Sequence, residues 1–267
     1  MTAGTAYAEV LLDITGNIAR LRMNRPESAN GMSAAFLRAF YDALLACHRE
    51  PDLRALIISG NGRHFSGGGD VRDFAEKGEA LPEYLREVTS WLQVSVSAMI
   101  RLPAPVIAQV HGYAAGGGGF GLVCAADLVV AADTARFLPA ATQVAMAPDG
   151  GTTVTLARLV GLRRAMRIVL TNETLTAHQA YDLGIVTEVV PEADLERRTT
   201  ELARTLAAGA PRALAASKRL LWDGIGRSVE EGLPDEARTV SELSGTADAR
   251  EGLAAVIERR TPKFTGR

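Results

Sequence analysis

The sequence has little of the chemistry that metal sites and disulfide frameworks need. It contains two cysteines, Cys47 and Cys124, and four histidines, and none of them stand at the short spacings typical of metal ligands. Both cysteines lie in apolar stretches with helical periodicity, so we expect two buried free thiols rather than a disulfide. We also expect no metal site.

A charge excess and long apolar runs are missing as well, and we expect no leader. The 267 residues carry a formal net charge of −2, which gives no electrostatic footprint for nucleic acid or for a membrane surface. No run approaches the roughly 18 apolar residues of a membrane span, and Met1–Val10 has neither a basic region nor an apolar signal core. We therefore expect a cytoplasmic protein with no nucleic-acid or membrane partner.

Glycine is abundant, with 26 residues, and it gathers in two clusters that each follow an apolar run. Val106–Val110 predicts a buried strand, and Gly116–Gly119 precedes an apolar segment that we predict to be helical to about Ala126. Upstream, the predicted strand Ala55–Ser59 and a polar turn precede Gly67–Gly69. Glycine lets a backbone approach a ligand closely, and a helix N-terminus offers unpaired N–H groups. Two such units predict two amide donors on one oxygen, an oxyanion hole.

The rest of the chain alternates predicted strands and helices up to Pro191 and is helical beyond it. Further strands are predicted at 8–14, 17–23, 128–132, 135–138 and 185–190. Helices are predicted at 34–49, 71–76, 81–100, 152–160, 163–170, 177–183, 193–207, 211–222, 228–244 and 246–260. This change of pattern predicts a division into an α/β core, residues 1–191, and a helical region, residues 192–267.

A set of motifs stands in a specific order and spacing: Met23–Pro26, Phe65–Asp70, Val110–Gly118, Leu156–Gly161 and Glu258–Phe264. Together they resemble the crotonase superfamily, also called the enoyl-CoA hydratase/isomerase family, over essentially the whole chain. The resemblance implies an α/β fold with a ClpP/crotonase-like ββα spiral core and a C-terminal helical trimerisation region. It also implies a homotrimer or dimer of trimers that acts on an acyl-CoA, with no cofactor beyond the coenzyme A thioester of the substrate.

The resemblance places the two oxyanion donors on the glycine clusters. The first donor matches Gly69. The second matches Gly117 when the motif is aligned from Gly112, and Gly118 when it is aligned back from Asp127. In this family the two N–H groups stabilise the enolate of the thioester, and one such donor is typically worth about 3–4 kcal/mol in the transition state.

The same resemblance assigns the contacts to coenzyme A. These fall on Arg25, on Gly67, Gly68 and Asp70 beside the first donor, and on Lys263 and Phe264, the last two often across a subunit boundary. From its local sequence, Asp70 is also expected to cap a helix. Ser66, His111 and Asp127 are expected to have structural roles.

The acidic residues depart from the pattern of the hydratases. Hydratases of the family use two glutamates, which would fall at Phe120 or Gly121 and at Ala141, and none of these positions is acidic. Asp149 matches instead the aspartate of family isomerases that shift double bonds. It also matches the nucleophile of 4-chlorobenzoyl-CoA dehalogenases, but the tryptophan and histidine that accompany that nucleophile are absent here.

A lone carboxylate beside an oxyanion hole suits a proton shuttle, because one group can remove a proton at one carbon and return it at another. Burial in an apolar pocket raises the pKa of such a group and makes it a base near neutral pH. We therefore expect an isomerase that shifts a double bond in an enoyl-CoA. The alternatives are an enoyl-CoA hydratase, a non-catalytic acyl-CoA-binding relative and, least favoured, a dehalogenase-like hydrolase.

Overall fold

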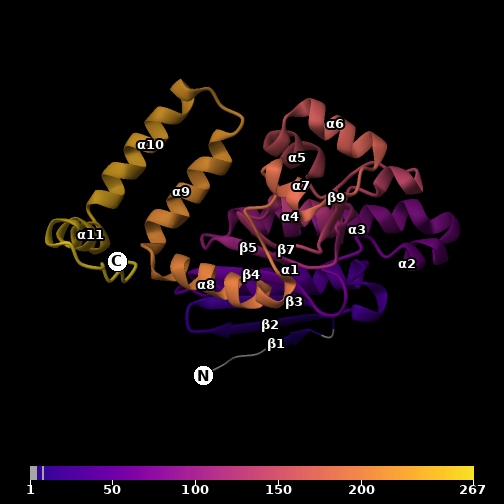
Figure 1. The fold of residues 1–267 in the computed structure, drawn as a ribbon, viewed down its shortest axis with the longest axis horizontal. Helices are drawn as coiled ribbons and strands as arrows, with labels where there is room; N and C mark the ends of the chain where they lie inside the picture. The colour runs from indigo at the N-terminus through magenta and orange to yellow at the C-terminus, as the bar shows by residue number, and fades with distance from the viewer. Residues whose placement is uncertain (1–4, 8) are drawn as a thin grey trace.

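The main sheet joins an antiparallel hairpin to a set of parallel strands. The computed structural model describes residues 5–7 and 9–267, and within them the sheet has the order β1-β2-β3-β4-β5-β7-β10 (Figure 1). The strands are β1 (Thr5–Tyr7), β2 (Val10–Thr15), β3 (Ile18–Met23), β4 (Ala55–Gly60), β5 (Val106–Val110), β7 (Leu128–Ala132) and β10 (Glu188–Val190). Strands β1 to β3 pair antiparallel, and the pairs from β3 to β10 are parallel.

The parallel strands are continuous apolar runs because they are covered on both faces. Every residue of β5 is buried, and in β4 the residues from Ala55 to Ser59 are buried. Because β4 and β5 are parallel, the chain segments that follow them leave the same edge of the sheet. A smaller sheet forms next to this edge from β6 (Tyr113–Ala115), β8 (Arg136–Leu138) and β9 (Leu175–Thr176).

The helices agree closely with the predicted ranges. They are α1 (Ala34–Arg49), α2 (Val71–Glu76), α3 (Leu81–Arg101), α4 (Leu122–Ala125), α5 (Thr152–Val160), α6 (Leu162–Thr171), α7 (Ala177–Asp182), α8 (Leu195–Ala208), α9 (Pro211–Gly224), α10 (Val229–Ser244) and α11 (Ala247–Glu258). Short 3₁₀ turns lie at Pro26–Ser28, Gly78–Ala80, Ala141–Val144 and Glu192–Asp194. Ser33 and Thr176 cap α1 and α7 through their side chains, as serine and threonine do at helix N-termini.

Two predicted elements differ from the structure. The strand predicted at 185–190 is wrong for its first residues, because the N–H groups of Ile185 and Val186 donate back to the carbonyl of Ala180 and keep them in a turn. The helix predicted after the glycine cluster begins as a π turn, Gly117–Gly121, and only Leu122–Ala125 is α-helical. The predicted hairpin is confirmed from residue 10 onward, and its first residue, Ala8, lies outside the described residues.

The change from mixed to helical structure falls near Pro191, as the sequence predicts. Helix α8 packs on β3, β4, β5 and β7, whereas α9, α10 and α11 lie to one side of the sheet, on the left in Figure 1. The division into two domains at this point stays a prediction. In the described part of the chain, none of the helices combines the length and apolar character that crossing a membrane requires.

Candidate active site

The two glycine clusters lie against each other at the end of β4 and β5. The N–H of Ser66 donates to the carbonyl of Tyr113 (3.0 Å), and the N–H of Ala115 donates to the carbonyl of Ser66 (2.9 Å). A Cβ built on Gly68, which has φ +95°, would lie 2.7 Å from the Ala115 oxygen. Glycine is therefore required at this position, both by the backbone conformation and by the close approach of the two loops.

Gly69 presents a free backbone N–H beside the second cluster. The flanking N–H groups are used: Met32 donates to the Gly68 carbonyl (2.8 Å) and Asp70 donates to the Met32 carbonyl (3.2 Å). Within the described chain, the N–H of Gly69 has no acceptor. This N–H is consequently available to a ligand, which is the property an oxyanion donor needs.

Gly117 and Gly118 open the π turn, where the first N–H groups of a helical segment have no intrahelical acceptor. A Cβ on Gly117 would lie 1.7 Å from Oδ1 of Asp149, and a Cβ on Gly118 would lie 2.4 Å from the sulfur of Met32. Gly117 is thus the glycine that lies against the Asp149 carboxylate. Both glycines line the same cavity as Gly69.

Asp149 occupies the loop that leads into α5, a turn made possible by the positive φ of Gly150 (+58°) and Gly151 (+77°). Its carbonyl accepts from the N–H and the hydroxyl of Thr152, at 3.0 and 2.7 Å. Its carboxylate forms no ion pair or side-chain hydrogen bond with another described residue. Burial raises the pKa of Asp149, and a bond to its own backbone N–H offsets part of that rise.

These groups line a cavity of about 390 Å³. The rest of its wall is mainly apolar and comes from α1, α2, α3, the turn at 141–144 and the loops that hold Met32 and Met146: Met32, Leu37, Val71, Phe74, Leu85, Val88, Leu92, Ala141, Val144 and Met146. Asp149 is the one titratable side chain among the described residues that line it. A carboxylate in such a cavity can exchange a proton with a bound molecule and has no charged neighbour there to compete.

The positions at which hydratases of the family carry their two glutamates lie in apolar surroundings in this structure. Phe120 is fully buried and packs on Phe137, with ring centroids 6.4 Å apart. Gly121 is buried, and a Cβ there would lie 2.7 Å from the hydroxyl of Thr152. Ala141 lines the cavity with a methyl group. The cavity therefore contains one carboxylate where the hydratase pattern has two.

Several predicted residues lie outside this cavity. Arg25 forms ion pairs with Glu9 and Asp70. Lys263 and Phe264 lie near the C-terminus, where the N–H of Lys263 donates to Glu251 and the carbonyl of Phe264 accepts from Arg54. Asp70 accepts from the N–H of Asp73 and caps α2, as predicted. The structure thus brings Gly67, Gly69, Gly117, Gly118 and Asp149 together, and it does not bring Arg25, Lys263 or Phe264 to them within one chain.

The residues expected to be structural are held by local hydrogen bonds. The hydroxyl of Ser66 donates to the Asn30 carbonyl and accepts from the N–H of Gly68, so it shapes the glycine loop. Nε2 of His111 lies 2.9 Å from the carbonyl of Gly62. Cys47 and Cys124 are buried free thiols, which confirms the prediction, and burial raises the pKa of each to about 12.

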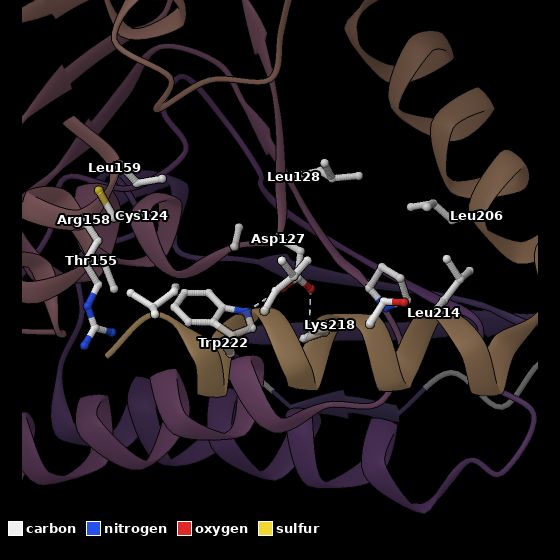
Figure 2. A pocket seen from close by; sticks show the side chains of 15 residues that line it. Cys124, Asp127, Leu128, Thr155, Arg158, Leu159, Leu206, Leu214, Lys218 and Trp222 are labelled. Carbon is white, nitrogen blue, oxygen red and sulfur yellow. Dashed lines mark hydrogen bonds and ion pairs between the residues drawn. The ribbon is translucent and has the colours of Figure 1, made fainter. Parts of the chain in front are cut away.

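A second cavity, of about 490 Å³, lies between α9 and the core. Figure 2 shows Lys218 and Trp222 of α9 pointing toward Asp127. Nζ of Lys218 is 2.7 Å from Oδ2 of Asp127, and the indole N–H of Trp222 donates to Oδ1 (2.9 Å). The N–H of Val106 also donates to Asp127 (2.7 Å). Every acceptor of this carboxylate is engaged, so the group joins α9 to the core, as the structural role predicted for Asp127 requires.

The sequence analysis missed Lys218 and the cavity wall formed by α3. Nζ of Lys218 also donates to the carbonyls of Met99 and Ala104, and burial lowers the pKa of this lysine. A lysine on an amphipathic helix gives no local sign of such burial. The spacing of Leu85, Val88 and Leu92 marks one helix face, but periodicity does not say whether that face meets a core or a cavity.

Comparison with known proteins identifies relatives of this chain. Residues 13–267 match the family model described as enoyl-CoA hydratase/isomerase. A probable enoyl-CoA hydratase of Rhodobacter capsulatus is 38% identical and covers 98% of this chain and 100% of its own length. A trans-2-decenoyl-[acyl-carrier-protein] isomerase of Streptococcus mutans is 31% identical, covering 98% and 99%. A putative enoyl-CoA hydratase of Streptomyces coelicolor A3(2) superposes with a TM-score of 0.93 at 31% identity, covering 98% and 96%.

The chain belongs to the enoyl-CoA hydratase/isomerase family. Its α/β structure is the crotonase fold, in agreement with the resemblance noted in the sequence. Relatives with hydratase names and with isomerase names both cover nearly the whole chain.

Proposed function

We propose that this chain is an isomerase that shifts a double bond in an enoyl-CoA. The observation that supports this proposal is the single carboxylate, Asp149, in a cavity lined mainly by apolar groups, with Thr89, Gln143 and backbone groups of the glycine clusters, among them the free N–H of Gly69, as the other polar groups. One base is enough to move a proton between two carbons of the same substrate. The name of one relative, a trans-2-decenoyl-[acyl-carrier-protein] isomerase, agrees with such a reaction.

The proposed reaction starts when the thioester oxygen of a 3-enoyl-CoA accepts hydrogen bonds from Gly69 and Gly117. Asp149 removes a proton from C2, and the electron pair of that C–H bond moves into the thioester to give a dienolate. The two N–H groups stabilise the negative charge on its oxygen. The carboxylic acid formed on Asp149 then returns the proton to C4, and the product is the 2-enoyl-CoA. No water and no cofactor enters this sequence.

Hydration is the alternative that the names of several relatives favour. Addition of water to a 2-enoyl-CoA uses one group to activate water and another to supply a proton in the family pattern. Here Ala141 and Phe120 leave Asp149 to do both. A non-catalytic acyl-CoA-binding relative and a dehalogenase-like hydrolase are the further alternatives, and the free N–H of Gly69 together with the unpaired Asp149 is what a catalytic site needs.

The experiment follows the double bond and the mass of the product in D₂O. The purified protein is incubated separately with 3-octenoyl-CoA and 2-octenoyl-CoA, and chromatography with mass spectrometry identifies the products. We expect interconversion of the two isomers, deuterium at C2 or C4, and no gain of water. A product heavier by one water identifies a hydratase. Unchanged substrates that nevertheless stabilise the protein against heat identify a binding protein.

Assembly is a second part of the proposal. We propose that the helical region, residues 192–267, joins subunits into a trimer or a dimer of trimers. Large apolar side chains stand exposed on α10 and α11, at Val229, Leu233, Val240, Leu253, Val256 and Ile257, and such faces mark interfaces. Light scattering during size-exclusion chromatography measures the mass; a monomer of 28.3 kDa would overturn this part. Lys263 and Phe264 would then be tested as contacts to coenzyme A on a neighbouring subunit.

A further inference from the structure

Arg25 is held among acceptors of this chain, on the loop that follows β3. Its Nε lies 3.0 Å from Oε1 of Glu9, and one terminal nitrogen lies 3.0 Å from Oδ2 of Asp70. The other terminal nitrogen donates to the carbonyl of Gly31 (2.5 Å). The arginine side chain is 17% exposed and that of Asp70 is 9% exposed. All three nitrogens of the guanidinium are therefore engaged within the chain.

The charge of this cluster does not suit a phosphate group. One arginine faces two carboxylates, Glu9 and Asp70, so the cluster as a whole is negative when all three groups are ionised. An anion that approached Arg25 would have to replace a carboxylate or lie beside it, and both arrangements are unfavourable. Arg25 itself is thus committed to contacts within the chain, and the other cations that line the same hollow are Arg38, Arg72 and Lys77.

The contacts of Arg25 lie on both sides of the segment that contains Gly69. Gly31 precedes Met32, whose N–H and carbonyl bond to Gly68 and Asp70 and so hold the segment that contains Gly69. Asp70 follows Gly69 directly, and its second oxygen accepts from the N–H of Asp73 at the start of α2. Arg25 therefore links the segment Gly31–Met32, which supports Gly69, to Asp70, which follows Gly69.

We infer that Arg25 is a positioning residue that, through Asp70 and Gly31, aims the N–H of Gly69 at the thioester oxygen. This inference rests on the proposed function, because it takes Gly69 as an oxyanion donor. Loss of the link frees the segment around Gly69 without removing its N–H group. Misplacement of a donor lowers the rate of the chemical step while contacts to the remainder of the substrate persist.

The experiment compares Arg25→Met and Arg25→Lys with Arg22→Met, a control at an exposed arginine of β3. In Arg25→Met we expect kcat to fall by about tenfold to a hundredfold, with KM and the Kd of free coenzyme A near the wild-type values. Arg25→Lys should recover part of kcat because an ammonium can still pair with Asp70. Asp70→Asn keeps the acceptor that caps α2 and removes the charge, so it should reproduce the defect and add little to Arg25→Met.

A second measurement does not depend on turnover. Acetoacetyl-CoA forms an enolate that absorbs in the ultraviolet, and an oxyanion hole favours that enolate in the bound ligand. We expect the wild type and Arg22→Met to raise the enolate fraction, and Arg25→Met and Asp70→Asn to lose most of that increase while still binding butyryl-CoA.

The other outcomes are distinguishable. A weaker affinity for coenzyme A with an unchanged enolate fraction would mean that Arg25 binds the cofactor portion of the substrate and would overturn the inference. A lower Tm with unchanged kcat and enolate fraction in the folded protein would make its role purely structural. If the wild type favours the enolate but isomerises nothing, the proposed reaction alone fails. If the wild type does not favour the enolate, Gly69 is no donor and the inference fails with it.

Discussion

Two aspartates lie beside two cavities in this molecule, and their surroundings are opposite. Asp127 accepts from Lys218, Trp222 and the N–H of Val106, and joins α9 to the core. Asp149 has no charged partner among the described residues, and burial raises its pKa. A carboxylate with all its acceptors engaged holds a structure together, whereas an unpaired carboxylate in an apolar cavity is available for proton transfer. The contrast distinguishes a structural acid from a candidate catalytic acid on physical grounds.

Removal of the Asp149 charge should give the largest effect on activity. We expect Asp149→Asn to lower kcat for double-bond migration by about 10²–10⁴-fold, the usual contribution of a general base, with little change in the fold. Kinetics with 3-octenoyl-CoA and circular dichroism provide the measurement. Asp182→Asn, at an exposed position on α7, is the control. Full activity in Asp149→Asn would exclude it as the proton shuttle.

Removal of the Lys218 cation at the second cavity should affect stability instead of activity. We expect Lys218→Met to lower the free energy of unfolding by about 2–4 kcal/mol, because it leaves the half-buried carboxylate of Asp127 without its cation. The kcat per folded molecule should stay near the wild-type value. Urea unfolding and active-site titration measure the two quantities. A loss of kcat in fully folded Lys218→Met as large as that in Asp149→Asn would show that the two cavities are coupled.

The sequence predicted the glycine clusters and their convergence because both depend on local chemistry. An apolar run of the Val106–Val110 kind specifies a buried strand, and the glycines that follow it tolerate conformations and contacts that other residues do not. Parallel strands then bring both clusters to one edge of the sheet.

The parts that were not predicted depend on contacts between distant segments. The buried ammonium group of Lys218 donates to the carbonyls of Met99 and Ala104, more than a hundred residues earlier in the chain. The sequence around Lys218 gives no sign of these contacts. The assignment of the second donor to Gly117 or Gly118 stays a prediction, and the contact that sets Gly117 apart is with Asp149, which comes from another loop. Motif alignment alone allowed both glycines.

A pair of glycine variants tests which of Gly117 and Gly118 lies closer to the reacting groups. In Gly117→Ala the new methyl group would overlap Oδ1 of Asp149, so we expect the carboxylate to be displaced and kcat to fall by about a hundredfold. In Gly118→Ala the methyl group meets the sulfur of Met32, the end of a flexible side chain, and the loss should be smaller. Steady-state kinetics of both variants decide the order. The reverse order would place Gly118, not Gly117, against the reacting groups.

The smallest expected effect is on stability as a function of pH, and it follows from the raised pKa of Asp149. In the unfolded chain this carboxyl has its ordinary pKa, so between the two values the folded protein binds more protons than the unfolded chain does. The stability that Asp149 contributes is therefore fully present below its unfolded pKa and is lost as pH rises through its folded pKa. At neutral pH the partly buried carboxylate of Asp149 is a net cost to folding.

Asp149→Asn removes this titration and should consequently have a higher Tm than the wild type at pH 7, with the difference shrinking toward pH 4. The kcat/KM of the wild type should rise with pH through the same folded-state pKa, because the base works only when deprotonated. Differential scanning fluorimetry over this range, with Asp182→Asn as control, measures the first effect. A Tm difference that stays constant with pH would mean that Asp149 is not an uncompensated, partly buried charge and does not differ from Asp127 in this way.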